Sequence, residues 1–370
     1  MEINIINEFI GSSPEKIGTN CWKWITENQS LDIYNQIKVL LLKHNCSLLQ
    51  SDELGKNKFA TYLIDNQTIS ITFFTECKRL IIVLDLLEFK QLPPLKPSNI
   101  NNVCKPKLSM ITLKNGNSFL GAGMSFVLTL SSGNFIIIDG GYNFNAAGLY
   151  SFLLKNTPKN QKPIITAWIL SHGHEDHVGC VFAFCEQYAN DIIVKSIVAN
   201  PYRSKTTVDP LKDLLTEETT TSLSNQFGAS WLCPHLGQVF YFDNCAIQFL
   251  HTQDETTENC DWLNKTSLSF MVTIKDQRIF FPTDFEDDSF AQLYGEDLKC
   301  DILQVTHHGC SGGTQEEYDY MKPKVAFFPI GKPFLEERLA PDYPRAANYY
   351  LINSVEKYFS DSGQTITLDL

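Results

Sequence analysis

The segment SHGHEDHVGC, residues 171–180, limits the fold of this chain more than any other stretch. It directly follows PIITAWIL, a nearly continuous apolar run of the kind that forms a strand buried on both faces of a sheet. The whole chain has only 8 histidines in 370 residues, so composition does not explain the crowding. A core would have to pair every polar atom of this segment, so we expect the chain to leave the sheet there at a ligand site. Four of its side chains commonly bind metal ions: His172, His174, Asp176 and His177.

The surrounding sequence alternates between strands and helices. Residues 125–141 predict two strands joined by the turn SSGN, and the amphipathic spacing of 144–156 predicts a helix. After the strand at 163–170, residues 178–189 predict a helix and 191–200 another strand. This alternation indicates a layered α/β architecture.

Further side chains that can bind metals lie where later strands end. The predicted hairpin GQVFYFDNCAIQFLHT ends at His251, and the predicted hairpin TSLSFMVTIKDQRIFFPTDFE leads to Asp284. Another apolar strand, in CDILQVTHHG, ends at His307 and His308. Layered α/β folds commonly build binding sites at such strand ends, so we expect these side chains to meet.

A proline-rich stretch divides the chain into two parts. Residues 91–107 contain four prolines and a run of asparagines, which suit a linker better than a helix or strand. Before it, 31–45 predicts a helix and 58–88 predicts three strands separated by DNQ and ECK. We therefore expect a small α+β domain over 1–90 and a second domain over 108–370. The small domain carries no chemical cluster and is interpreted as a module for packing, oligomerisation or partner binding.

Composition and charge limit the setting and the partners of the chain. Hydrophobic residues make up 43%, which is enough for a sizeable core. The formal net charge of −12 argues against a dedicated nucleic-acid scaffold, so nucleic acid is expected only as a substrate. The 11 cysteines lack regular spacing and MEINIINEFIGSS lacks a basic, then apolar leader, which favours a reducing, cytoplasmic setting. The apolar run RLIIVLDLLEF is too short to cross a membrane, so no membrane partner is expected.

The spacing of the candidate ligands predicts a site for two divalent metal ions. Residues i and i+2 of an extended segment project to the same side, so His172 and His174 can hold one ion. Asp176 and His177 begin the next helix and can hold the second, with Asp284 as the carboxylate between the two ions. Imidazole and carboxylate ligands together suit zinc best, with manganese or iron as alternatives.

Two assignments stay open on spacing alone. His251 would complete the shell of the first ion, but an ordinary half-buried histidine is an equally good interpretation. His307 would complete the second shell because it directly follows the apolar run, although spacing does not decide between it and His308.

The pattern H-x-H-x-D-H after a buried strand resembles the metallo-β-lactamase fold superfamily. FIIIDGG (135–141), NKTSLSFMVTIKDQRIFFPTDFE (264–286) and DILQVTHHGCSGG (301–313) resemble further segments of that fold. Together they look most similar to the hydrolase domain of DNA-uptake (competence) proteins and its stand-alone relatives, over residues 108–370. The resemblance implies an αββα sandwich with the metals at one edge of two sheets. It also implies the metal ligands His172, His174, Asp176, His177, His251, Asp284 and His307.

Two departures weaken the transfer of a substrate from that group. Residues 121–124 are GAGM where the group has Gly-Gln-Gly-Asp. LAPDYPR (339–345) lacks the histidine of the group's usual final loop. Both changes leave the candidate metal ligands intact.

The resemblance implies a dinuclear metal-dependent hydrolase that attacks a phosphodiester or another ester-type bond with hydroxide held by the metals. Asp176 would orient the water and accept its proton, and His308 would protonate the leaving group or contact an oxyanion. The alternatives are a lactone or thioester hydrolase of the same fold and a non-catalytic metal-binding or interaction module. Redox chemistry at a di-iron site ranks below them, because family members of that type usually have a carboxylate in place of His174 and carry a flavin domain.

Several residues near the motifs have secondary interpretations. The largely polar stretch 200–231 predicts a loop or lid with a short helical part around PLKDLL. Asp139 in IDGG is expected to support the site rather than bind metal, and Cys180 and Cys185 are expected in the core. His235 is expected at the surface or in ordinary packing, as is His44. Residues that would contact the substrate are Tyr142, Phe144, Tyr202, Arg203 and Lys205.

Overall fold

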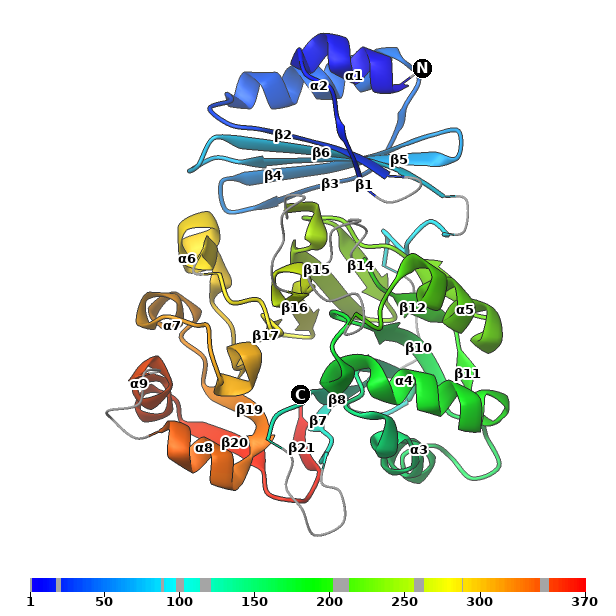
Figure 1. Cartoon of the computed structure of the whole chain (residues 1–370), viewed down its shortest axis with the longest axis vertical. Helices are drawn as coiled ribbons and strands as arrows, with labels where there is room; N and C mark the ends of the chain where they lie inside the picture. The colour runs from blue at the N-terminus through cyan, green and yellow to red at the C-terminus, as the bar shows by residue number, and fades with distance from the viewer. Residues whose placement is uncertain are drawn as a thin grey trace.

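In the computed structural model, two β-sheets pack face to face with helices on both outer sides, and a third sheet with its own helices lies at the N-terminal end (Figure 1). The expected fold class, an αββα sandwich with an N-terminal α+β unit, is confirmed. The structure describes residues 2–17, 21–87, 90–97, 103–113, 121–201, 213–255, 263–287, 289–339 and 346–370.

The first sheet of the sandwich has a parallel centre. Its strand order is β13-β12-β10-β9-β8-β7-β21, with β11 paired to β10 beside this path. β10 runs parallel to both β9 and β12, and parallel neighbours need long crossover connections, which here contain helices. The strands are β7 (Lys107–Met110), β8 (Ser125–Thr129), β9 (Phe135–Asp139), β10 (Ile164–Ile169), β11 (Ile193–Val194), β12 (Ser196–Val198), β13 (Ser230–Leu232) and β21 (Ile366–Asp369).

The second sheet begins with antiparallel hairpins and ends with parallel strands. Its order follows the sequence from β14 to β20, antiparallel up to β17 and parallel beyond it. Its inner face meets that of the first sheet, where Phe126 packs edge-on against Phe281 with ring centroids 5.3 Å apart. The strands are β14 (Val239–Phe242), β15 (Cys245–His251), β16 (Ser269–Ile274), β17 (Gln277–Phe281), β18 (Ile302–Gln304), β19 (Val325–Gly331) and β20 (Lys357–Asp361).

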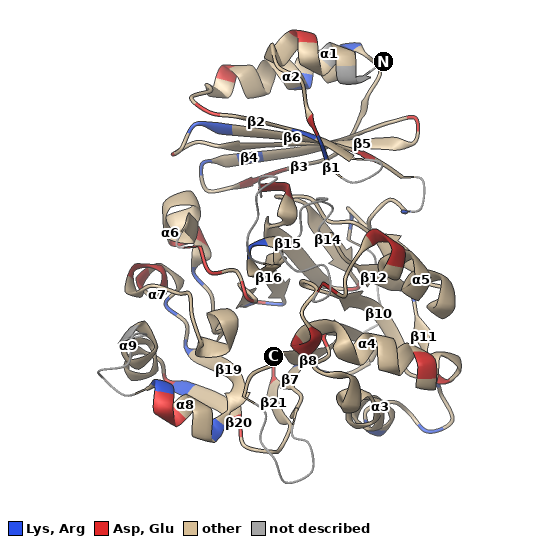
Figure 2. Cartoon of the chain, in the orientation of Figure 1, with Lys and Arg blue, Asp and Glu red and all other residues tan. Residues whose placement is uncertain are grey.

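Helices cover the two outer faces of the sandwich. α3, α4 and α5 lie on the first sheet, and α6, α7, α8 and α9 lie on the side of the second (Figure 1). Acidic residues occupy the first turn of both α4 and α5 (Figure 2), where they complement the positive end of the helix dipole. The helices are α3 (Ala146–Lys155), α4 (Glu175–Tyr188), α5 (Glu217–Phe227), α6 (Ser289–Tyr294), α7 (Gln315–Met321), α8 (Lys332–Arg338) and α9 (Ala346–Ser354).

The N-terminal sheet is covered on both faces. Its order is β1-β2-β6-β5-β4-β3, all antiparallel, and α1 and α2 pack on one face around Tyr34, Ile37 and Leu41. The other face lies toward the sandwich (Figure 1). The elements are α1 (Glu2–Ile10), β1 (Glu15–Ile17), β2 (Cys21–Thr26), α2 (Leu31–Lys43), β3 (Ser47–Leu54), β4 (Asn57–Ile64), β5 (Gln67–Phe74) and β6 (Arg79–Leu86).

Side chains of the N-terminal sheet share a core with the sandwich. Phe74 packs edge-on against Tyr294 of α6 at 5.9 Å, and both belong to one buried cluster with residues of β17 to β19. The expected linker is also attached, because the N–H of Gln91 donates to the carbonyl of Trp231 (3.0 Å) and that of Tyr241 donates to the carbonyl of Pro94 (2.7 Å). The two parts of the chain therefore meet over a packed apolar surface.

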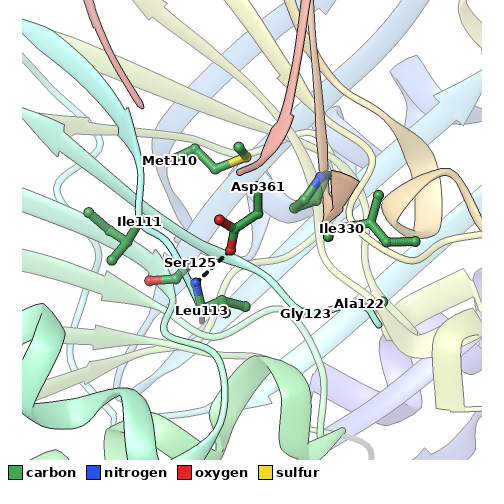
Figure 3. A pocket seen from close by; sticks show the side chains of 10 residues that line it. Met110, Ile111, Leu113, Ala122, Gly123, Ser125, Ile330 and Asp361 are labelled. Atoms are coloured by element: carbon green, nitrogen blue, oxygen red, sulfur yellow. Dashed lines mark hydrogen bonds between the residues drawn. The ribbon is translucent and has the colours of Figure 1, made fainter. Parts of the chain in front are cut away.

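The last two strands, β20 and β21, join the two sheets of the sandwich. β20 is the last strand of the second sheet, whereas β21 pairs with β7 at the edge of the first. At the end of β20, the Asp361 carboxylate accepts a hydrogen bond from the backbone N–H of Leu113 (2.8 Å; Figure 3) and one from the hydroxyl of Thr112 (2.7 Å). A cavity of about 10 Å³ beside this contact has room for about one water molecule and is lined in part by Ser125 and Ile330.

The described structure differs from the sequence expectations in one region above all. Within 200–231, residues 202–212 lie outside the described part, and residues 213–215 of the predicted helical stretch are not helical. The helix α5 and the strand β13 follow instead, so this region adds one strand to the first sheet and one helix to its outer face. The predicted strand at 191–200 is divided into β11 and β12. In the described portion of the chain, no helix combines the length and the apolarity needed to cross a bilayer.

Candidate metal centre

The candidate site lies where several strands and one helix end. β10 leads into Ser171 and His172, and α4 begins at Glu175 with His174 immediately before it. β17 is followed by Asp284, and β18 by the short 3-10 helix η6 (Thr306–Gly309). The strand ends thus bring together side chains that are far apart in the sequence.

Three side chains form the first ligand group. Ligand atoms of His172, His174 and Asp284 all lie within 4.8 Å of one another. His172 Nε2 is 2.9 Å from His174 Nδ1 and 3.9 Å from Asp284 Oδ2. The i, i+2 spacing therefore places both rings on one side of the chain, as an extended segment should.

Three further side chains form the second ligand group. Ligand atoms of Asp176, His177 and His308 also lie within 4.8 Å of one another. His308 Nε2 is 3.1 Å from His177 Nε2 and 3.5 Å from Asp176 Oδ2. The first turn of α4 supplies two of these groups, and η6 supplies the third.

Asp284 lies between the two groups. Its Oδ2 is 3.1 Å from His177 Nε2, 3.2 Å from His308 Nε2 and 3.9 Å from His172 Nε2. Burial raises the pKa of this carboxyl, but the charges of His177 and His308 outweigh burial and hold the pKa well below its usual range. The carboxylate is therefore in its ionised, ligand-competent form.

Asp139 and Ser171 fix the orientation of His177. Asp139 Oδ2 lies 2.7 Å from His177 Nδ1, and the same carboxylate accepts hydrogen bonds from the backbone N–H and the hydroxyl of Ser171, both at 2.7 Å. A proton on Nδ1 leaves the Nε2 lone pair of His177 aimed at Asp284 and His308. The expected supporting role of Asp139 agrees with this geometry.

The donor set fits divalent cations. The buried Asp284 Oδ1 and His308 Nδ1 have no hydrogen-bond partner among the described residues. Several ring nitrogens and a carboxylate converge at distances close to 3 Å, where facing lone pairs repel unless a proton or a metal cation lies between them. Burial, helped by the neighbouring His177, lowers the pKa of His172 well below its usual value, which keeps that ring neutral for coordination.

A sequence comparison agrees with this geometry. Residues 119–214, which include the histidine cluster, match the family model described as Metallo-beta-lactamase superfamily. This match supports the resemblance of the chain to the metallo-β-lactamase superfamily. It gives no support to the finer resemblance to competence proteins. No curated protein matches the chain by sequence.

Several solved structures are distantly similar to this chain. The metallo-β-lactamase fold protein YhfI from Bacillus subtilis has a TM-score of 0.44 and 12% identity, covering 71% of this chain and 100% of that one. CmlA, a diiron β-hydroxylase from Streptomyces venezuelae, has a TM-score of 0.42 and 10% identity, covering 72% and 54%. A metallo-β-lactamase from Cronobacter sakazakii has a TM-score of 0.32 and 13% identity, covering 50% and 74%. Likenesses of this size carry no information on substrate.

The structure separates His307 from His308. The backbone of both residues has positive φ, 44° and 58°, so the chain turns sharply at this pair. His308 points to the second ligand group, whereas His307 contacts Glu286 and Ser311 through Nδ1 and lies 3.6 Å from Asp284 through Nε2. This geometry favours His308 as the ligand, the reverse of the expectation that His307 completes the second shell.

His251 belongs to neither ligand group among the described residues. Its Nδ1 donates to the carbonyl of Ser267 at 2.8 Å, and its ring stacks on Phe285 at a centroid distance of 3.6 Å. Burial lowers the pKa of His251 to about 4, so the ring is neutral. The structure thus places it beside the site without bringing it to the other ligands.

The remaining sequence-based expectations have mixed outcomes. Tyr142 and Phe144 stack at 5.3 Å, while Cys180 and Cys185 are buried as expected. His235 is not at the surface but buried between two carboxylates. The expected phosphate contacts Tyr202, Arg203 and Lys205 lie outside the described residues.

Sequence reasoning missed the partners that come from distant loops. Glu286 contacts His307, and Asn264 Nδ2 is 3.5 Å from His307 Nε2. Asp213 packs over Gly173, whose carbonyl accepts a hydrogen bond from the N–H of Leu214 (2.9 Å). Only Glu286 carried a local signal, since it follows the strand end at Asp284 by two residues.

Proposed function

We propose that this protein is a dinuclear metal-dependent hydrolase that acts on a phosphodiester or another ester-type bond. The observation that carries the proposal is the position of Asp284 between the two ligand groups, within 4 Å of ring nitrogens of both. A carboxylate shared by two cations is the usual core of a two-metal hydrolytic site. Zinc suits the imidazole and carboxylate donors best, with manganese or iron as alternatives.

Each group would hold one cation. His172, His174 and Asp284 would hold the first, and Asp176, His177 and His308 would hold the second with the same Asp284. Bound metals would supply Lewis acidity and lower the pKa of water at the site toward neutrality. His251 remains a candidate metal ligand only because its ring stacks on Phe285, the residue that follows Asp284.

The protein's own side chains would orient water and handle protons. Asp176 is the more exposed of the two ligand carboxylates, with 24% of its side chain accessible, so its second oxygen can accept a proton from an attacking water. His307 would protonate the leaving group. Burial lowers the pKa of His307, but the hydrogen bond that its ring donates to Glu286 and the charge of Asp284 outweigh burial and raise the pKa. The raised pKa favours the protonated form of this ring.

A hydrolysis panel on the metal-loaded full chain tests the proposal. The panel comprises bis(p-nitrophenyl) phosphate, phosphorylcholine esters, single-stranded DNA, lactones and thioesters. We expect phosphodiester cleavage that falls by roughly 10²–10⁴-fold in Asp176→Asn, with Asp65→Asn on an exposed turn as the matched control. Preference for a lactone or thioester would move the assignment to that hydrolase class. Absence of turnover with two metals bound would favour a non-catalytic metal-binding module.

A further inference from the structure

A second cluster of metal-binding side chains lies between the N-terminal sheet and the sandwich. Ligand atoms of Asp85, Cys233 and His235 all lie within 4.8 Å of one another, and all three residues are buried. Asp85 is on β6 of the N-terminal sheet, whereas the other two follow β13 of the sandwich. The cluster shares no residue with the candidate metal centre.

The ring of His235 is oriented as the ring of a metal ligand usually is. Its Nδ1 lies 2.9 Å from Asp254 Oδ2, and its Nε2 faces Asp85 Oδ2 at 3.0 Å. A carboxylate on one ring nitrogen commonly fixes the tautomer and the direction of a histidine whose other nitrogen binds metal. Asp254 is held in turn by the side-chain amide of Asn200 at 3.2 Å and the N–H of Leu236 at 3.3 Å.

The charges of the cluster allow a zinc ion to replace two protons. With His235 protonated on both nitrogens, its charge and that of Lys90, which contacts Asp85, balance the carboxylates of Asp85 and Asp254. If a Zn²⁺ ion displaces the Nε2 proton of His235 and the thiol proton of Cys233, the double charge of the ion replaces the charges of the two protons that leave. The net charge of the buried cluster is then unchanged, so burial does not oppose the exchange.

We propose that Asp85, Cys233 and His235 form a zinc site that fastens the N-terminal sheet to the sandwich. Nitrogen, oxygen and thiolate ligands in one buried group select zinc among common cellular cations. The fourth tetrahedral position is left for a water molecule. The ion links β6 to the segment after β13, two parts of the chain that otherwise meet through apolar packing and hydrogen bonds.

Cobalt substitution of the full chain tests this site separately from the candidate metal centre. A thiolate bound to Co²⁺ gives an intense charge-transfer band in the near ultraviolet, and neither ligand group of the candidate metal centre contains a cysteine. We expect the band in the wild-type protein and in Asp284→Asn, but not in Cys233→Ser. Zinc analysis should show about one ion fewer per chain in Cys233→Ser than in the wild type.

Cys310→Ser is the matched control, because Cys310 is half-buried beside His307 and is the cysteine next to the candidate metal centre. This variant should keep the band. The proposal is overturned if the wild-type protein lacks the band or if Cys310→Ser loses it. The spectra of these two proteins give that result even if Cys233→Ser does not fold. The cluster would then be a purely ionic chain through Lys90, Asp85, His235 and Asp254.

Discussion

Asp284 is the side chain on which both ligand groups depend. Its Oδ2 lies 3.1 Å and 3.2 Å from the two ring nitrogens of the second group and 3.9 Å from His172 of the first. We expect Asp284→Asn to lower the occupancy of both metals together, because an amide is a much weaker bridging ligand than a carboxylate. Metal analysis after dialysis measures this, with the exposed Asp287→Asn as control. Normal metal content in Asp284→Asn would remove the bridging assignment.

The two adjacent histidines should respond differently to truncation. We expect His308→Ala to lose about one metal ion per chain, because His308 faces Asp176 and His177. His307→Ala should keep both metals and lose roughly 10²–10⁴-fold in turnover, as expected when a proton donor is removed. Metal content and turnover, measured on the same preparations, separate the two roles. A loss of metal in His307→Ala instead would restore the ligand role expected from sequence.

His251 makes acid destabilising. Its pKa is lowered to about 4 in the folded chain by burial, against 6.5 for a free ring. The folded state therefore favours the neutral ring, and stability present above pH 6.5 is lost as the pH falls toward 4. Over that interval His251 should remove ~3 kcal/mol of unfolding free energy. In His251→Asn, whose amide can still donate to Ser267, we expect the unfolding free energy measured with urea to depend less on pH across this range. An unchanged slope of the unfolding free energy against pH would contradict this origin of acid sensitivity.

Local spacing predicted part of the site. His172, His174, Asp176 and His177 lie close in sequence, so strand and helix geometry alone placed them together. The pair His307–His308 could not be resolved in the same way, because positive φ at both residues redirects their side chains. The contact with Glu286 depends on the fold of a loop that spacing does not describe.

At the scale of elements, the turn between β10 and α4 is tightly enclosed. A Cβ on Gly173 would lie 1.8 Å from Asp213 Oδ1 and 3.1 Å from the backbone nitrogen of Leu215. We expect Gly173→Ala to cost roughly 1–3 kcal/mol by overpacking and to weaken metal binding by moving the turn. Thermal unfolding and metal titration measure both effects.

Gly148 in α3 provides the matched control for that substitution. A Cβ there would meet nothing within 4 Å. Gly148→Ala should therefore raise the unfolding free energy by roughly 0.5–1 kcal/mol, because alanine is the better helix former. Equal effects of the two substitutions would show that the turn tolerates a side chain.

Strongly periodic elements were predictable from sequence, and polar ones were not. The hairpin strands β14 to β17 and the helix α2 follow clear apolar patterns. α5 was missed because Thr, Ser and Glu dominate it and give no apolar periodicity. Thr216 caps the start of this helix, because its side chain accepts a hydrogen bond from the N–H of Thr219. Gly228, with φ of 64°, ends the helix. Those cap residues were the available signal.

At the scale of the whole molecule, the N-terminal sheet is built into a shared core. Phe59, Phe74 and Val83 belong to the same buried cluster as Phe280 and Leu303 of the sandwich. Removal of residues 1–90 would expose this apolar surface, so we expect the fragment 91–370 to aggregate or to unfold at a lower temperature than the full chain. Soluble yield and thermal unfolding measure this. A soluble fragment with unchanged metal content and unfolding temperature would show that the second part is independent.

The pairing of the last strand, β21, with the early strand β7 has a consequence for biosynthesis. β21 pairs with β7, about 260 residues earlier in the chain, and the Asp361 carboxylate holds Leu113 and Thr112 beside that edge. While the ribosome is still adding residues 357–369, the edge at β7 has no neighbour on that side and remains open to pairing with other nascent chains. The nascent chain is thus open to misassembly at this edge until β21 has been made and has paired with β7.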